Sequence, residues 1–206
     1  MLRWLYRPQC AACAKPSLDG APLCADCAVS LVPLTAQPEA RAPLQRVASP
    51  WAFGGALASA IRRLKFAGAT HIARTIAPLW APLLEAAVIE HDAIVVPVPL
   101  HWRRRLRRGF DQTWLLAAHA CALAKLPPPV AALRRIRYDA PQSTLAAAER
   151  AANIEGAFRA RADVTGRAII LVDDVTTTGS TLVTAARALG DAGASLVVGI
   201  TVARAE

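Results

Sequence analysis

The stretch AIILVDDVTTTGSTL, residues 168–182, decides the fold of this 206-residue chain. Its first five residues are apolar and β-branched for the most part, which predicts a buried strand over 168–172. Beyond the turn, four apolar residues recur at helical spacing: Leu182, Val183, Ala186 and Leu189. We therefore expect a helix over 180–191. A further apolar run at 195–202 would complete a strand–helix–strand unit with a right-handed parallel crossover.

The turn between this strand and this helix has the composition of an anion site. Backbone N–H groups at a helix N-terminus lack intrahelical partners, and the helix dipole favours an anion, so phosphate is the expected occupant. Gly179 lets the backbone approach closely, while hydroxyl donors come from Thr177, Thr178, Ser180 and Thr181. The carboxylates of Asp173 and Asp174 suit ribose hydroxyls, or water on Mg²⁺. The alternative is a plain turn with one capping hydroxyl, which needs neither carboxylate.

Residues 169–182 resemble the loop of the phosphoribosyltransferase family that binds 5-phosphoribosyl-1-pyrophosphate (PRPP). The resemblance implies that Asp173 and Asp174 hold the ribose hydroxyls of PRPP, that residues 177–181 bind its 5′-phosphate, and that Mg²⁺ accompanies it. Thr177 stands where purine-salvage members of the family have an aspartate proposed to handle a base proton. Threonine cannot act as a general base at neutral pH, so a purine-salvage reaction is not expected.

Alternating strand and helix patterns predict an α/β fold with a mainly parallel sheet flanked by helices. Residues 1–48 are expected to form a small zinc ribbon and a proline-rich linker, and residues 49–206 a phosphoribosyltransferase-like domain. Within the larger domain we expect further strands or turns at 51–55, 93–99, 133–137 and 154–158, and helices at 56–66, 70–90, 111–126 and 146–152, the second of these kinked or broken at Pro78 and Pro82. Ligands bind such sheets at the carboxyl ends of strands. The ends near Pro99 and Asp173 therefore predict one shared cleft.

Four of the five cysteines lie near the N-terminus in two Cys-x-x-Cys knuckles: Cys10, Cys13, Cys24 and Cys27. This spacing predicts a tetrahedral zinc site, and four thiolates leave no open coordination position, so the zinc would be structural. Disulfides are the alternative, which a chain without an export signal disfavours. Cys121 stands alone in an apolar helix and is expected in the core.

The charge pattern indicates polyanionic ligands. The net charge is +9, and 21 of the 24 basic residues are arginines, which recognise phosphate through a planar fork. No apolar run approaches the length of a membrane span, and the first eight residues are too short for a signal peptide, so a cytoplasmic location is expected.

The arginines concentrate at one segment, which carries five of them within residues 103–108. Three interpretations stay open: the arginines bind pyrophosphate, or a nucleic-acid backbone with Trp102 or Phe110 stacked on a base, or they form only a solvated basic loop. The candidates for pyrophosphate or nucleic-acid contact are Arg105, Arg108, Gln112 and Arg150. Arg150 and Asn153 would share a helix face that reaches the cleft or is simply solvated.

The motifs Pro97-Val98-Pro99 and Arg107-Arg108-Gly109-Phe110-Asp111-Gln112 resemble the ComF competence family. The resemblance extends to Leu64-Lys65-Phe66, Leu133 to Arg137, Gln142, Glu149-Arg150, Asn153, Gly156 to Phe158 and the cysteine knuckles. It implies a PRPP-binding protein with an N-terminal zinc module and Mg²⁺, which handles single-stranded DNA during uptake beside competence DNA-translocation proteins. Asp111 replaces the family's usual Asn, and we expect it to pair with Arg107 or Arg108. Transfer of phosphoribose to an unknown acceptor, and regulation in response to PRPP, are the alternatives.

Overall fold

A computed structural model describes residues 8–37, 41–137 and 156–205 of the chain. All pairings in its main sheet are parallel, in the order β1-β7-β6-β3, and β2 also pairs with β7. A short antiparallel hairpin is formed by β4 and β5. The elements are η1 (Leu18–Gly20), α1 (Ala25–Ala28), β1 (Arg46–Ala48), β2 (Trp51–Ala52), α2 (Gly55–Phe66), α3 (His71–Ile76), η2 (Ala77–Leu79), α4 (Ala81–His91), β3 (Ile94–Pro97), α5 (Trp102–Arg108), α6 (Gln112–Leu123), β4 (Leu133–Arg135), β5 (Phe158–Ala160), β6 (Ala168–Thr176), α8 (Ser180–Asp191) and β7 (Leu196–Arg204).

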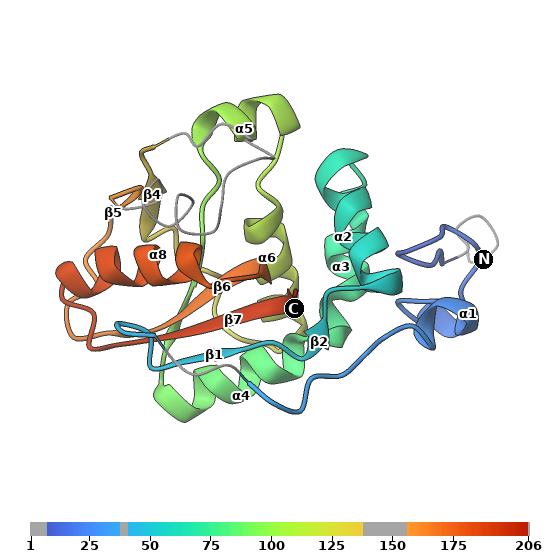
Figure 1. The fold of residues 1–206 in the computed structure, drawn as a ribbon, viewed down its shortest axis with the longest axis horizontal. Helices are drawn as coiled ribbons and strands as arrows, with labels where there is room; N and C mark the ends of the chain where they lie inside the picture. The colour runs from blue at the N-terminus through green and yellow to red at the C-terminus, as the bar shows by residue number, and fades with distance from the viewer. Residues whose placement is uncertain (1–7, 38–40, 138–155, 206) are drawn as a thin grey trace.

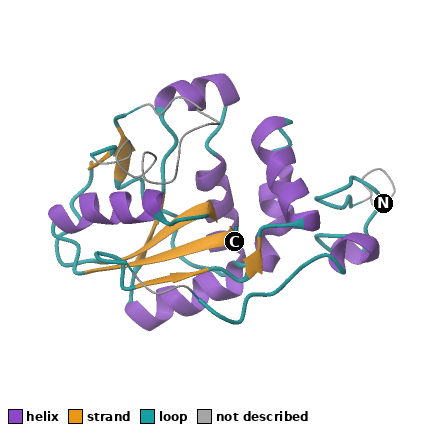
Figure 2. Cartoon of the chain, viewed as in Figure 1, coloured by secondary structure: helices purple, strands orange, loops and turns teal. Residues whose placement is uncertain are grey.

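Helices cover both faces of the main sheet, as Figure 2 shows. Because side chains alternate along a strand, β6 sends Ile170 and Val172 to one face and Ile169 and Leu171 to the other. The first face packs against α2, α3, α4 and α6, and the second against α8 and the β4–β5 hairpin. The expected α/β fold with a parallel sheet is confirmed.

The cysteine-rich module packs against α2 beside the sheet (Figure 1). Cys10, Ala11 and Leu23 join the same buried cluster as Leu57 and Leu64 of α2. The module is thus joined to the larger domain through its own apolar residues.

Three hydrogen bonds also tie the module to α2. The Arg63 guanidinium donates to the backbone carbonyls of Cys10, at 3.2 Å, and Ala11, at 2.7 Å. At the other end of α2, the hydroxyl of Ser30 accepts from the Ala56 N–H at 2.9 Å. This hydroxyl satisfies one of the N–H groups that a helix start leaves unpaired.

Several elements differ from the expected ones for identifiable reasons. Residues 46–48, expected within the linker, form β1, because they pair with Val198 to Ile200 of β7. The segment 70–90 is broken as expected near Pro78, and Pro82 falls in the first turn of α4, where its missing N–H costs no hydrogen bond. The strand expected at 154–158 is observed as β5, which ends at Ala160, two residues later than expected. The expected helix at 146–152 lies outside the described residues.

No single helix in the described ranges is long and apolar enough to cross a membrane. The pair His71–Leu79 and Ala81–His91 reaches the required length only jointly, with a bend of 68° between its parts. Ile72, Ile76 and Leu84 of this pair, and Trp80 between its two parts, are fully buried in the core.

Candidate functional site

The turn between β6 and α8 lies at the carboxyl end of the central strand. Gly179 precedes α8 with a φ of 76°, a left-handed conformation that glycine adopts without a Cβ clash. A Cβ built at Gly179 would meet only the Thr176 Oγ1, at 3.9 Å, so the backbone conformation and not the space requires glycine. Thr177 and Thr178 are exposed, and the hydroxyls of Thr178 and Ser180 share a hydrogen bond. The predicted turn at a helix N-terminus is confirmed, with Thr181 in the first turn of α8.

The two acids lie within β6, which continues to Thr176 instead of ending at residue 172. Asp173 pairs with Thr201 and Val175 with Ala203, so β7 extends the strand past the acids. Successive strand residues point to opposite faces, which places Asp173 on the α8 side and Asp174 on the α2 and α6 side. The two carboxylates therefore meet different neighbours.

Asp173 is held in an environment that disfavours its charge. Burial, and then the charge of Asp174, raise the pKa of Asp173 to about 7, against weaker opposing effects of the Asp174 N–H, Lys65 and Arg135. The Asp174 N–H donates to Oδ1 of Asp173 at 2.8 Å. Near neutral pH this carboxyl group can accept or release a proton.

Asp174 is the end of a hydrogen-bonded chain that crosses the site. Lys65, the penultimate residue of α2, places its Nζ 2.8 Å from Oδ2 of Asp174, and the Gln112 amide donates to the same oxygen at 3.1 Å. The Arg108 guanidinium donates to Oε1 of Gln112 and lies 5.6 Å from the ring centre of Phe66. The structure thus brings Arg108, Gln112 and Asp174 together.

Among these hydrogen-bonded side chains, Lys65 is the one that was not predicted from the sequence to belong to the site. Lys65 belongs to the Leu64-Lys65-Phe66 motif, which indicates family resemblance but no role, and its partner Asp174 is 109 positions away. One signal in the sequence points to it. It is one of three lysines among 24 basic residues, and it lies next to Phe66 in the last turn of an amphipathic helix.

The arginine-rich segment forms α5 and is not a loop. The His101 Nδ1 accepts from the Arg103 N–H at 3.3 Å at its start, and Gly109, with a φ of 84°, ends it. This ending is the common one, in which glycine takes the left-handed position after the last turn. Trp102 and Leu106 are 57% and 75% exposed, so the helix presents apolar groups together with its cations.

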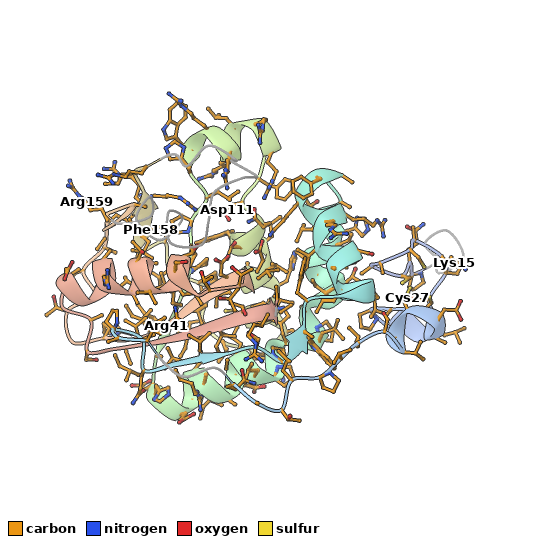
Figure 3. The ribbon with its side chains drawn as sticks, in the orientation of Figure 1. Lys15, Cys27, Arg41, Asp111, Phe158 and Arg159 are labelled. Carbon is orange, nitrogen blue, oxygen red and sulfur yellow. The ribbon has the colours of Figure 1, made fainter. Side chains whose placement is uncertain are left out.

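The expected ion pair of Asp111 with Arg107 or Arg108 is wrong. Asp111 is the N-cap of α6: its Oδ1 accepts from the N–H groups of Thr113 and Trp114, and its Oδ2 accepts from Leu100. None of the ion pairs between described residues includes it. Figure 3 shows Asp111 below α5 at the start of α6. A carboxylate, like the family's amide, can cap a helix, which explains why the replacement is tolerated.

The four N-terminal cysteines form one cluster. Their Sγ atoms all lie within 4.8 Å of one another, and those of Cys13 and Cys24 are 3.7 Å apart. A tetrahedral zinc ion with Zn–S bonds of about 2.3 Å would hold its sulfurs about 3.8 Å apart, so the cluster fits the metal. No disulfide is present among the five cysteines, which disagrees with the alternative interpretation. Burial raises the pKa of Cys10, but hydrogen bonds from the backbone of Cys13, Cys24 and Ala12 outweigh it and lower the pKa to about 6, which favours a thiolate.

Three predicted contact residues lie outside the described residues: Gln142, Arg150 and Asn153. Arg105 is described and lies on α5, but it lines a separate cavity and does not join the chain from Arg108 to Asp174. Cys121 is buried in the core as expected.

Comparison with known proteins agrees with this arrangement. Residues 117–205 match the family model of the phosphoribosyl transferase domain. DNA utilization protein YhgH of Escherichia coli K12 is 32% identical over 198 residues, which cover 91% of this chain and 86% of that protein. YhgH of Salmonella typhimurium LT2 is 31% identical over 199 residues, which cover 91% of this chain and 86% of that protein. Competence protein F of Haemophilus influenzae is 33% identical over 129 residues, 59% of this chain and 56% of that protein. With a relative of this similarity matched over most of its length, and with a phosphoribosyltransferase domain, the chain belongs to the ComF family.

Proposed function

We propose that the protein binds Mg²⁺-PRPP at the end of β6 and handles single-stranded DNA. One observation carries the PRPP part: a carboxylate pair lies near the end of a central parallel strand, two residues before a turn of hydroxyls and a left-handed glycine. The backbone N–H groups of the first turn of α8, with Thr178, Ser180 and Thr181, would hold the 5′-phosphate. Asp173 and Asp174 would accept hydrogen bonds from the ribose hydroxyls.

Two groups from other elements would complete the site. Lys65 and Arg108 place cations on the α2 and α6 side of Asp174, where they would bind the pyrophosphate. Carboxylates also suit Mg²⁺, which keeps several waters and uses one or two acidic groups together with substrate phosphates. The acids at this strand end fit that donor set, and the ion would screen the pyrophosphate charge.

The DNA part of the proposal rests on charge and on relatives. The chain carries a net charge of +9, and α5 places five arginines and an exposed tryptophan beside the PRPP site. Its relatives are named for DNA utilization and competence, which supports a role in DNA uptake. In that role the protein would act beside DNA-translocation proteins in the cytoplasm. The zinc cluster would be structural and would fix the N-terminal module.

Thermal stabilisation tests the PRPP site. Mg²⁺-PRPP at 100 times its dissociation constant should stabilise the folded protein by about 2.7 kcal/mol, and Asp173→Ala/Asp174→Ala should remove the shift. Ribose 5-phosphate with Mg²⁺ should give a smaller shift, because it lacks the pyrophosphate. A native protein that shows no shift with PRPP would overturn this part of the proposal.

Salt dependence tests the DNA role. The logarithm of the affinity for oligo(dT) should fall with the logarithm of salt concentration, with a slope of about −0.7 per phosphate contact. Arg103, Arg104 and Arg107 replaced together by Ser should flatten that slope. A wild-type slope near zero would contradict arginine–phosphate contacts. Release of pyrophosphate from PRPP, measured with and without the oligonucleotide, would show whether binding leads to turnover.

A further inference from the structure

We infer that a cavity between β3, α5, α6 and the β4–β5 hairpin takes one base of the single-stranded DNA. This inference rests on the proposed DNA role and assigns the place where the strand is recognised. The cavity has a volume of about 480 Å³, within the range of small-ligand sites. In the part of the chain that the structure describes, residues 173–181 do not line it, so it is distinct from the proposed PRPP site.

The cavity combines apolar side chains with aromatic rings. Pro97, Pro99 and Leu133 supply apolar surface, and Phe110 and Trp114 supply rings. Trp114 is 37% exposed, although its neighbours Thr113 and Leu116 are at most 1% exposed. A large indole left open in a cavity offers the kind of surface on which bases stack, whichever base is presented.

Cations stand at the same cavity. Arg105 of α5 and Arg161, just past β5, both line it and are exposed. Neither forms one of the ion pairs between described residues. The lining carboxylate, Asp111, already accepts from three backbone N–H groups, so it is directed toward the start of α6. The site therefore offers two guanidinium groups, without an ion-pair partner among the described residues, to a phosphate next to the stacked base.

The basic surface extends beyond the cavity, which favours a polymer over a mononucleotide. Arg134 of β4 and Arg159 of β5 lie directly opposite each other in the hairpin. Like charges in opposed positions destabilise a strand pair unless an anion offsets them. Both side chains are exposed, and Figure 3 shows Arg159 on the hairpin. These two arginines would meet the phosphates that follow the bound base.

Fluorescence anisotropy with a labelled oligo(dT) strand tests the stacking. Trp114→Leu should weaken binding about ten-fold, the effect of one lost stacked base, while leaving the salt slope unchanged. Trp114→Phe should restore most of the affinity. Leu123→Ala, at an exposed position nine residues further along α6, is the matched control and should bind like wild type.

Separate measurements test the contact of Arg161 with phosphate and the recognition of the base itself. Arg161→Ser should reduce the salt slope by about 0.7, whereas Arg167→Ser, at the opposite end of the sheet, should not. On an abasic strand of equal length, wild type and Trp114→Leu should bind equally, since no base is present to stack. Deoxythymidine monophosphate is expected to compete only weakly.

The outcomes separate this inference from the proposed function. If the wild type shows no salt-dependent binding to oligo(dT), the DNA role fails and the base site with it. If the wild type binds but Trp114→Leu is unchanged, or is equally impaired on the abasic strand, the base site alone is overturned. A Trp114→Leu effect on the mononucleotide but not on the oligonucleotide would also overturn it.

Discussion

Lys65 and Asp174, 109 positions apart in sequence, form an ion pair at 2.8 Å that joins the end of α2 to the end of β6. The Lys65 side chain is 23% exposed and that of Asp174 is 5% exposed. A charge so nearly buried requires a partner, because an unpaired carboxylate would lose its hydration without compensation. This pair links the helix that contacts the cysteine module to the strand that carries both acids of the proposed PRPP site.

Lys65→Met should destabilise the protein strongly. Removing the cation leaves Asp174 buried, with the Gln112 amide as its one remaining side-chain partner among the described residues. The expected cost is about 3 kcal/mol, or about 6–12 °C in melting temperature. Lys15→Met is the control: its ion pair with Asp26 is 3.9 Å long and exposed on both sides, so it should change stability by less than about 0.5 kcal/mol. Equal effects of the two variants would contradict a buried pair, and Lys65→Met/Asp174→Asn should recover most of the loss.

Asp173 should make stability depend on pH. Its pKa in the folded protein is about 7, against about 4 in an unfolded chain. Between these values the folded state holds a proton that the unfolded state has released, so stability falls as pH rises from 4 to 7. Asp173→Asn keeps an oxygen for the Asp174 N–H and removes the titration. Chemical denaturation should therefore find the variant more stable than wild type at pH 8, with a smaller difference at pH 4; a difference independent of pH would count against the raised pKa.

Gly179→Ala separates backbone strain from ligand binding. Alanine at a φ of 76° should cost about 1–2 kcal/mol. Gly166→Ala is the matched control, because Gly166 has a φ of 69°, open space for a Cβ, and a position before the start of β6. Both variants should lose similar stability, but only Gly179→Ala should lose the shift in melting temperature with Mg²⁺-PRPP. Retention of the full shift by Gly179→Ala would place the phosphate elsewhere.

Zinc should be bound at one ion per chain. Elemental analysis of protein prepared under reducing conditions should find this ratio in wild type and in Cys121→Ser, and well below it in Cys13→Ser. Burial raises the pKa of the Cys121 thiol to about 11, so that residue should remain an inert thiol. A metal-free wild type would contradict the site.

Removal of zinc should also weaken the hydrogen bonding at the start of α2. The Ala56 N–H donates to Ser30, which follows the last cysteine of the cluster by three residues. Hydrogen exchange at Ala56 should accelerate when a chelator takes the metal, whereas the Val183 N–H in α8 should exchange at an unchanged rate. Equal changes at both positions would indicate global unfolding.

The central unit was predictable because its signals are local. The strand, turn and helix from residue 168 to 191 follow from apolar runs, helical spacing and a glycine at the turn, and the structure reproduces them. The four cysteines are predictable for the same reason, since their spacing alone brings them together. These features need no knowledge of distant parts of the chain.

The features that could not be predicted depend on distant partners. β1 is three residues long and exists because β7 pairs with it. β6 runs through Asp173 and Asp174, although acids disfavour strands, because the edge of β7 continues beside it. The contact of Lys65 with Asp174 requires the packing of α2 on the sheet. By contrast, Gly109 after the arginines is a helix-ending signal that the sequence does contain.

Isothermal titration of Mg²⁺-PRPP into the wild type and into Asp173→Asn/Asp174→Asn tests the PRPP site most directly. The wild type should bind one PRPP per chain with a saturable heat, and the double variant, which keeps its side-chain volumes, should give none. A wild type that gives no heat, or a double variant that binds as tightly as the wild type, would contradict a PRPP site at the end of β6.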